Sequence, residues 1–355
     1  MNAPDRPPNE PRLTALSHGG GCGCKIAPGV LSEILQGMSP MLMPKELLVG
    51  IETADDAAVY QLNDEQALIA TTDFFMPIVD DPFEFGRIAA TNSISDVYAM
   101  GGKPILALAI VGMPIGVLST QTIGRVLEGG NQIARAAGIP IAGGHTIDSV
   151  EAIYGLVALG LVHPKRIKRN ADAKVGDRLI LGKPLGVGVM SAALKKEQLS
   201  ADDYALMIAY ATKLNTPGPD LAALDGVHAL TDVTGFGLAG HALEIAKGAK
   251  AQAVIDWHKV PLIGGVRELA TQGFITGASS RNWAGYSADV ALPADFAKED
   301  RALLTDPQTS GGLLVSCNAT AVHEVMAIFR RHGFEAVAEI GHIAAQHGGP
   351  RLTVR

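Results

Sequence analysis

Apolar residues along the chain fall into short runs separated by glycine-rich turns, and the runs follow two periodicities. Five runs are rich in β-branched residues and bounded by turn residues, which predicts strands at 47–62, 66–75, 104–114, 139–148 and 152–162. Two longer segments have helical apolar spacing and end in glycine, which predicts helices at 85–100 and 119–138. The first half of the chain therefore alternates strands with helices.

A basic segment at 163–177 interrupts this pattern, and we interpret it as a solvated linker. Beyond it, three helices are predicted near 190–199, 203–214 and 238–249, and strands near 177–186, 253–260 and 311–318. The pattern indicates a tail and three parts: a disordered tail (1–17), a flexible glycine/cysteine loop with a short helix (18–48), an N-terminal domain (49–168) and a C-terminal domain (176–355).

Composition narrows the class of protein. The 355 residues are 47% apolar and 18% charged, which is typical of a packed globular protein of two domains with α/β or α+β structure. The net charge of −7 gives no basic field for nucleic acid or an anionic membrane. The proline-rich first twelve residues lack the apolar core of a signal peptide, and three cysteines do not suit a disulfide framework. We expect a cytoplasmic protein without nucleic-acid or membrane partners.

Aspartates at the ends of apolar runs are the first candidate chemistry: Asp55, Asp56, Asp73, Asp96 and Asp232. A single aspartate at such a place is usually a cap or turn residue. If several converge, each like-charged pair at 4 Å costs about 4 kcal/mol at an effective dielectric constant of 20, so a cation is required. Hard oxygen ligands favour Mg²⁺, which shares phosphate oxygens and so predicts a nucleoside triphosphate.

Asp96 resists interpretation as a cap. Ile88, Asn92 and Asp96 recur every four residues on the predicted helix and therefore share one face. A face that starts apolar and continues through an amide and a carboxylate indicates a polar cleft. No phosphate-binding glycine motif of the common types is present, although AGGHT at 142–146 and GFGLAGHALE at 235–244 expose backbone N–H groups.

The segment SHGGGCGCKIAP at 17–28 holds two of the three cysteines, Cys22 and Cys24. A disulfide across one residue is strained, a lone CxC lacks the second ligand pair of a zinc site, and buried inert thiols do not suit a glycine-rich loop. We predict a reactive thiol on a mobile arm, with Lys25 close enough to favour the thiolate. Cys317, at a strand end, is predicted to be a core residue.

Taken in order, these segments resemble one family. SHGGGCGCK, ETADDAAVY, TTDFF, TNSISDVYAMGGKP, AGGHTID, LTDVTGFGLAGH and DPQTSGGLL closely resemble the selenophosphate synthetase (selenide, water dikinase) family, from about Leu13 to the C-terminus. The acidic and DPQTSGG segments are shared more loosely with aminoimidazole ribonucleotide synthetase and thiamine-monophosphate kinase, whereas the cysteine loop is not. The resemblance implies a two-domain α+β fold whose N-terminal half-barrel sheet pairs in a homodimer, with ATP bound between subunits and domains.

The resemblance also implies an activity: ATP, selenide and water give selenophosphate, AMP and phosphate. By position, Cys22 and Lys25 resemble the family's catalytic residues, and its Mg²⁺ ligands are matched by Asp56, Asp96 and Asp232. The residues that resemble its ATP contacts are Lys25, Thr53, Ala54, Asp55, Asp73, Asp96, Gly144, His145 and Thr146. Asn92 and Gly143 are near neighbours of lower rank, and Cys24 is a less critical companion of Cys22.

Two alternatives remain at this point. The chain could be another ATP-dependent kinase or synthetase of the superfamily, against which the CxC loop counts. It could instead be a non-catalytic selenium or metal carrier, against which the aspartates count, because a carrier needs no nucleotide site. How selenium reaches Cys22, free or from a selenium-delivering protein as partner, is left open by the sequence.

Overall fold

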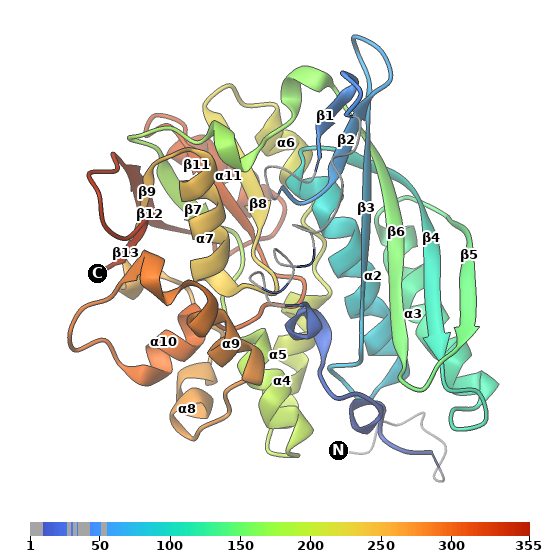
Figure 1. Cartoon of the computed structure of the whole chain (residues 1–355). Helices are drawn as coiled ribbons and strands as arrows, with labels where there is room; N and C mark the ends of the chain where they lie inside the picture. Colours follow the sequence, from blue (N-terminus) through green and yellow to red (C-terminus); the bar gives the residue numbers. More distant parts are fainter. Residues whose placement is uncertain (1–9, 27–29, 31–33, 35–42, 51–54) are drawn as a thin grey trace.

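The computed structural model describes residues 10–26, 30, 34, 43–50 and 55–355, and within them two β-sheets lie side by side (Figure 1). The N-terminal sheet has the strand order β1-β2-β3-β6-β4-β5. Its strands are β1 Leu47–Val49, β2 Ala58–Gln61, β3 Ala67–Phe75, β4 Lys103–Met113, β5 Ile141–Asp148 and β6 Ile153–Val162. The pairs are antiparallel except β4 with β5, which is parallel. All five predicted strand runs thus lie in one sheet: four of them give one strand each, and the 47–62 run gives two.

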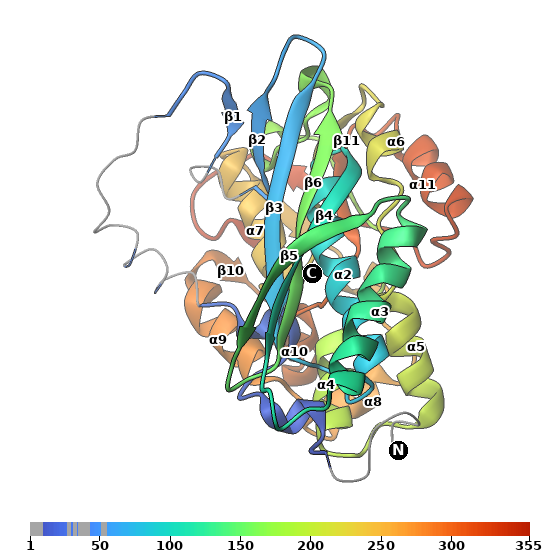
Figure 2. The ribbon, with the colours of Figure 1, turned by 90° about the vertical axis from the view of Figure 1, so that its right-hand side faces the viewer.

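Two helices cover one face of this sheet, α2 (Pro82–Ala99) and α3 (Thr120–Ala136). The side chain of Asp81 caps α2 by accepting hydrogen bonds from Phe83 N and Glu84 N, and Pro82 suits the first helical position. Ile88 is fully buried in the core. The opposite face carries exposed apolar side chains, including Phe74, Ile105 and Leu108 (Figure 2 shows the strands of this sheet in front of α2). The N-terminal sheet is therefore packed on one side only.

The C-terminal sheet has the order β10-β13-β9-β12-β7-β11-β8. Its strands are β7 Arg178–Leu181, β8 Val227–Asp232, β9 Gln252–Ile255, β10 Val290–Ala291, β11 Leu313–Cys317, β12 Ala338–Ala344 and β13 Leu352–Val354. The helices around it are α4 Val187–Lys195, α5 Ala201–Ala211, α6 Gly218–Ala222, α7 Gly237–Gly248, α8 Val266–Thr271, α9 Gly277–Tyr286, α10 Lys298–Leu304 and α11 Val322–Arg331. Cys317 is fully buried in β11, as predicted.

The basic segment between the domains contains two short 3₁₀ turns, η3 Pro164–Arg166 and η4 Asn170–Asp172. It is not solvated throughout, because Asn170 is buried and η4 packs against α7 and β8. No helix in the described part of the chain is long and apolar enough to cross a membrane.

The chain before Cys22 differs from the expected disordered tail in residues 10–17. Leu13–Leu16 forms a 3₁₀ turn, η1, and the Leu13 side chain is buried. Asp80 holds this turn by accepting hydrogen bonds from Thr14 and from the Arg12 guanidinium at 2.7 Å. This turn was not predicted because four residues are too few to show a periodicity. The burial of Leu13 depends on contacts that exist only in the folded protein.

Candidate functional site

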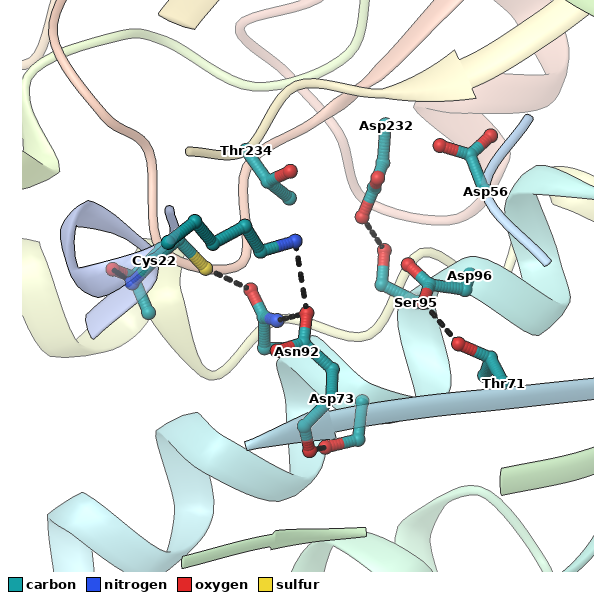
Figure 3. A network of polar contacts seen from close by, with 12 residues as sticks. Cys22, Asp56, Thr71, Asp73, Asn92, Ser95, Asp96, Asp232 and Thr234 are labelled. Carbon is teal, nitrogen blue, oxygen red and sulfur yellow. Dashed lines mark hydrogen bonds and ion pairs between the residues drawn. The ribbon is translucent and has the colours of Figure 1, made fainter. Parts of the chain in front are cut away.

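Buried polar side chains meet where β3 and α2 approach the C-terminal domain. Thr71 and Asp73, two residues apart on β3, point to the same face, toward Asn92 and Asp96 on α2 (Figure 3). Thr71 donates to Asp96 Oδ2 at 2.5 Å, and Asn92 Nδ2 donates to Asp73 Oδ2 at 2.7 Å. The four-residue spacing of Asn92 and Asp96 thus gives both of them a partner on β3. These contacts fix two carboxylates at the inner face of the sheet.

Two further carboxylates reach the same region from other segments. Asp232 ends β8, is 1% exposed and accepts a hydrogen bond from Ser95 Oγ at 2.5 Å. Asp56 precedes β2, and its Oδ1 accepts a hydrogen bond from Thr231 Oγ1 at 2.8 Å. Figure 3 shows Asp56, Asp96 and Asp232 facing a common region. The predicted metal ligands, which come from distant parts of the sequence, are brought together.

The three carboxylates disfavour one another's ionisation. Burial raises the pKa of Asp56, Asp96 and Asp232, and the charge of Asp232 raises it further at the other two. Asp56 Oδ2 is buried without a hydrogen-bond partner in the described residues. A cation there would supply the missing contact, and the donor set of carboxylate oxygens suits Mg²⁺.

The described side chains do not form a complete metal-binding site by themselves. In that part of the chain, no group of three or more His, Cys, Asp or Glu side chains is arranged to bind a metal ion by itself. Mg²⁺ commonly takes only one or two protein carboxylates and completes its shell with water and substrate phosphates. The arrangement therefore fits a metal that is held jointly by the protein and a nucleotide.

The cysteine loop enters this site from the side of Asp73. Gly21–Cys24 forms a 3₁₀ turn, η2, in which Cys22 is 1% exposed. The Cys22 thiol donates to Asn92 Oδ1 at 3.1 Å, and its backbone N–H donates to Thr309 Oγ1 at 3.3 Å. Gly21 has φ +54°, and a Cβ there would lie 2.3 Å from Thr309 Oγ1. Glycine is thus required at this position both by backbone conformation and by space.

Lys25 lowers the pKa of Cys22, as predicted, but in this conformation the net pKa of the thiol is raised. Burial raises the pKa of Cys22, the charge of Asp73 raises it further, and Lys25 does not offset them. Burial opposes the charged form of Lys25, but Asp73, whose Oδ2 lies 3.4 Å from Lys25 Nζ, and the other acidic groups of the site together outweigh burial and raise the pKa of Lys25. Lys25 therefore forms its ion pair with Asp73, and the docked Cys22 is a protonated thiol that donates a hydrogen bond.

The DPQTSGG segment supports Asn92, a role that was not predicted from the sequence. Ser310, at φ +57°, donates its backbone N–H to Asn92 Oδ1 at 2.7 Å. The buried Lys183 Nζ donates to the carbonyls of Ser310 (2.8 Å) and Lys213 (2.6 Å), and burial lowers its pKa to about 7. Asn92 thus has both ends of its amide fixed by neighbours. A lysine in an apolar run gave no signal of this role, because its partners are backbone atoms distant in sequence.

Not all predicted residues gather at this place. Thr53 and Ala54 lie outside the described residues. Asp55 turns toward the interdomain segment, where its Oδ1 accepts a hydrogen bond from the Asn170 backbone at 2.8 Å. The position of Asp55 thus links the two domains at the rim of the site.

Gly144, His145 and Thr146 lie on β5, at the edge of the N-terminal sheet, and are exposed. Strands β6 and β4 separate β5 from β3, so these residues are distant from the aspartates of their own chain. A Cβ at Gly144 would lie 2.0 Å from the Ala109 carbonyl oxygen, so β4 passes too close for any other residue. One chain by itself does not assemble the whole predicted nucleotide site.

Both domains match family models of known proteins. Residues 54–162 match the family model "AIR synthase related protein, N-terminal domain", and residues 174–352 match "AIR synthase related protein, C-terminal domain". Among solved structures, thiamine-monophosphate kinase from Stenotrophomonas maltophilia has a TM-score of 0.63 at 20% identity, covering 93% of this chain and 96% of its own. Hydrogenase maturation protein HypE in complex with ATP has a TM-score of 0.59 at 19% identity, covering 95% and 90%. These likenesses show the fold and confirm the predicted two-domain α+β class.

Curated relatives are much closer in sequence. The chain is 65% identical over 337 residues to the selenide, water dikinase of Burkholderia cenocepacia, covering 95% of each chain. It is 62% identical to that of Dechloromonas aromatica (98% and 99% covered) and 56% identical to that of Rhizobium meliloti (94% and 96% covered). With these identities over nearly the full length, the chain belongs to the selenide, water dikinase family.

Proposed function

We propose that this chain makes selenophosphate, AMP and phosphate from ATP, selenide and water. The observation that carries the proposal is the hydrogen bond from the Cys22 thiol to Asn92, whose amide also holds Asp73. A soft sulfur atom is thereby placed at the border of a site whose other groups are hard carboxylates. Such a pairing suits a reaction between a chalcogen nucleophile and a phosphoryl group.

In this proposal Asp56, Asp96 and Asp232 hold Mg²⁺ together with the nucleotide. Bound Mg²⁺ would neutralise phosphate charge as the phosphoryl group is transferred. Asp73 positions Lys25, whose raised pKa keeps its ammonium charged beside the transferring group. Asn92 orients the Cys22 thiol, and the docked arm excludes water from it, since Cys22 is almost completely buried.

The proposal includes a homodimer. The open face of the N-terminal sheet exposes Phe74, Ile105 and Leu108. Strand β5 is an edge strand, which pairs with β4 on one side and has no neighbouring strand on the other side within the described chain. Pairing of two such sheets would cover the apolar face and bring Gly144, His145 and Thr146 of one copy to the nucleotide site of the other. Sedimentation at micromolar concentration should show a dimer, and a fully active monomer would overturn this part.

The compartment we propose is the cytoplasm. All three cysteines are free thiols, and the proposed role of Cys22 needs it reduced. Expression without a secretion signal should therefore give a soluble enzyme whose cysteines are reduced.

Phosphorus NMR of the purified protein with ATP, Mg²⁺ and selenide tests the activity directly. We expect resonances of selenophosphate, AMP and orthophosphate in equal amounts, and none of the three to accumulate when selenide is omitted. Sulfide in place of selenide distinguishes a selenium enzyme from a less selective kinase. ATP consumption that is independent of selenide would show that the proposed activity is wrong.

A further inference from the structure

A pocket of about 620 Å³ lies beside the cysteine arm, and none of the aspartates of the candidate site lines it. Its walls are the arm, helix α4 and the segment that leads into α9; in Figure 1 the blue arm lies beside α9. Cys24 lines this pocket, whereas Cys22 does not. The two thiols, one residue apart, therefore open toward different spaces.

The pocket is basic in a protein whose net charge is −7. Lys25, Lys195, Lys196 and Arg281 line it, and none of its described lining residues is acidic. Arg281 donates to the Gly23 carbonyl at 2.9 Å and Lys195 to the Ser17 carbonyl at 3.2 Å, so both cations hold the arm through neutral acceptors.

An acidic group stands near the pocket but is already engaged. Glu151 accepts hydrogen bonds from His18, at 2.8 Å from its ring and 2.9 Å from its backbone. At the Cys24 thiol, the charge of Glu151 raises the pKa, and the charges of Arg281 and Lys195 lower it. Glu151 is not among the described residues that line the pocket, and the cations that do line it favour an anion there.

A second, much smaller void of about 10 Å³ lies beside Cys22. Gly23, Lys25, Ala278 and Arg281 line both this void and the large pocket, so the two spaces are adjacent. A volume of this order is about that of one water-sized probe. A monatomic or diatomic species could pass to Cys22 here after small side-chain movements, whereas a nucleotide could not.

We infer that this basic pocket is the entry port for selenium in the form of a small soft anion of the hydrogen selenide type, and that it is separate from the nucleotide site. The inference rests on the proposed function, because it assigns the route of one of its substrates. An anion that approached Cys22 across Asp73, Asp96 and Asp232 would meet like charge, whereas the pocket offers the cations Lys195, Lys196 and Arg281 in addition to Lys25, whose ammonium is paired with Asp73. Arg281, which is common to the pocket and the void, is the positioning residue at the passage.

Steady-state kinetics provide the first test. In Lys195→Gln/Lys196→Gln and in Arg281→Gln we expect the KM for selenide to rise about five- to tenfold at low ionic strength, with Mg²⁺–ATP affinity unchanged. Glutamine removes the charge and keeps an N–H donor on a shorter side chain. Arg281→Lys should restore a KM close to that of wild type, and Lys174→Gln, which removes one charge as Arg281→Gln does but at an exposed interdomain lysine, should leave the KM unchanged.

Chemical labelling of Cys24 provides a test that involves no selenium. In a Cys22→Ser/Cys317→Ala background Cys24 is the only cysteine, and its alkylation by iodoacetate, an anion, is compared with that by neutral iodoacetamide. Any change in the thiol's own reactivity cancels in the ratio of the two rates. Adding Lys195→Gln, Lys196→Gln and Arg281→Gln should lower the iodoacetate-to-iodoacetamide ratio about five- to tenfold, and high salt should reduce this difference.

An unchanged labelling ratio overturns the inference. It is also overturned if ATP affinity falls together with selenide affinity, because the pocket would then belong to the nucleotide site. An unchanged KM for selenide with slowed product release would make the pocket an exit, which likewise contradicts it. If the charge-dependent labelling holds but phosphorus NMR detects no selenophosphate, the proposed function fails while the anion selectivity of the pocket stands.

Discussion

The surroundings of Cys22 and Cys24 differ more than their positions in the sequence suggest. Cys22 faces carboxylates, with Asp73, Asp96 and Asp232 all raising its pKa in addition to burial. Cys24 faces Arg281 and Lys195, and burial raises its pKa to about 11 in spite of them. The chain between them is a single glycine, Gly23, so the turn η2 sends the two side chains to opposite sides.

This difference suggests a division of labour between the thiols. The acidic side suits the Mg²⁺ ion of a metal–nucleotide complex, while the basic side suits a free anion. The cysteine loop lies between the acidic side and the basic side, and it would keep the metal–nucleotide complex and the free anion apart until they meet at Cys22. Mutations on the two sides should therefore have separable effects.

The largest expected effect is that of Cys22→Ser. Selenophosphate formation should fall at least about a hundredfold, because a serine hydroxyl has little affinity for selenium and hardly ionises. Binding of Mg²⁺–ATP, measured by calorimetry, should change less than about threefold, since the aspartates are untouched. A Cys22→Ser variant that kept most of its activity would show that Cys22 does not have the role assigned to it here.

Asp96→Asn should be next, with loss of about ten- to a hundredfold in Mg²⁺-dependent ATP consumption. Wild-type protein should gain thermal stability on addition of Mg²⁺ and nucleotide, and the variant should gain much less. Without metal, the variant should be at least as stable as wild type, because a buried carboxylate with a raised pKa no longer has to ionise. Normal turnover with an unchanged Mg²⁺ requirement would contradict the assignment of Asp96.

Cys24→Ser should be much milder, with a several-fold loss that is confined to limiting selenide. The thiol lines the pocket but does not touch the aspartate site, so the rate at saturating selenide should be close to that of wild type. Rate measurements over a range of selenide concentrations separate the two regimes. If Cys24→Ser were less active than Cys22→Ser, the proposed roles of the thiols would be reversed.

A pH effect on stability should come from Lys183, the buried support of Ser310. Its pKa in the folded state is about 7, below its value in the unfolded chain, so the unfolded chain binds more protons between about pH 7 and 10.5. Stability should therefore rise with pH in this range, by at most about 1.4 kcal/mol per pH unit from this group. Urea unfolding at pH 7 and pH 9 should show this increase in wild type and a smaller one in Lys183→Met.

The smallest effect on activity is expected for Cys317→Ala. Its side chain is fully buried in β11 and borders neither of the two spaces next to the arm. We expect unchanged kinetic constants and a loss of unfolding free energy of about 1 kcal/mol from the smaller side chain. A marked loss of turnover at normal stability would mean that a third thiol takes part.

Much of the architecture was predictable from pattern. The strands on either side of α2 and the end of α2 followed from apolar periodicity and glycine stops, whereas α2 begins at Pro82, three residues before the predicted start. The docking of η1 was not predictable, because Leu13 is buried only by contacts that the folded domains create. Nor was the role of Lys183, whose partners are the carbonyls of residues 30 and 127 positions away.

The sequence by itself determined which groups are present: two thiols in a glycine-rich arm, acidic residues at the ends of apolar runs, and a helix with Asn92 and Asp96 on one face. It also determined the family, through the order of its motifs. Only the tertiary structure decided how these groups act on one another. Ionisation depends on burial and on neighbours within a few ångströms, and those neighbours come from distant segments. The same Lys25 that favours a thiolate in an extended arm is therefore paired with Asp73 once the arm is folded, and Cys22 remains a thiol.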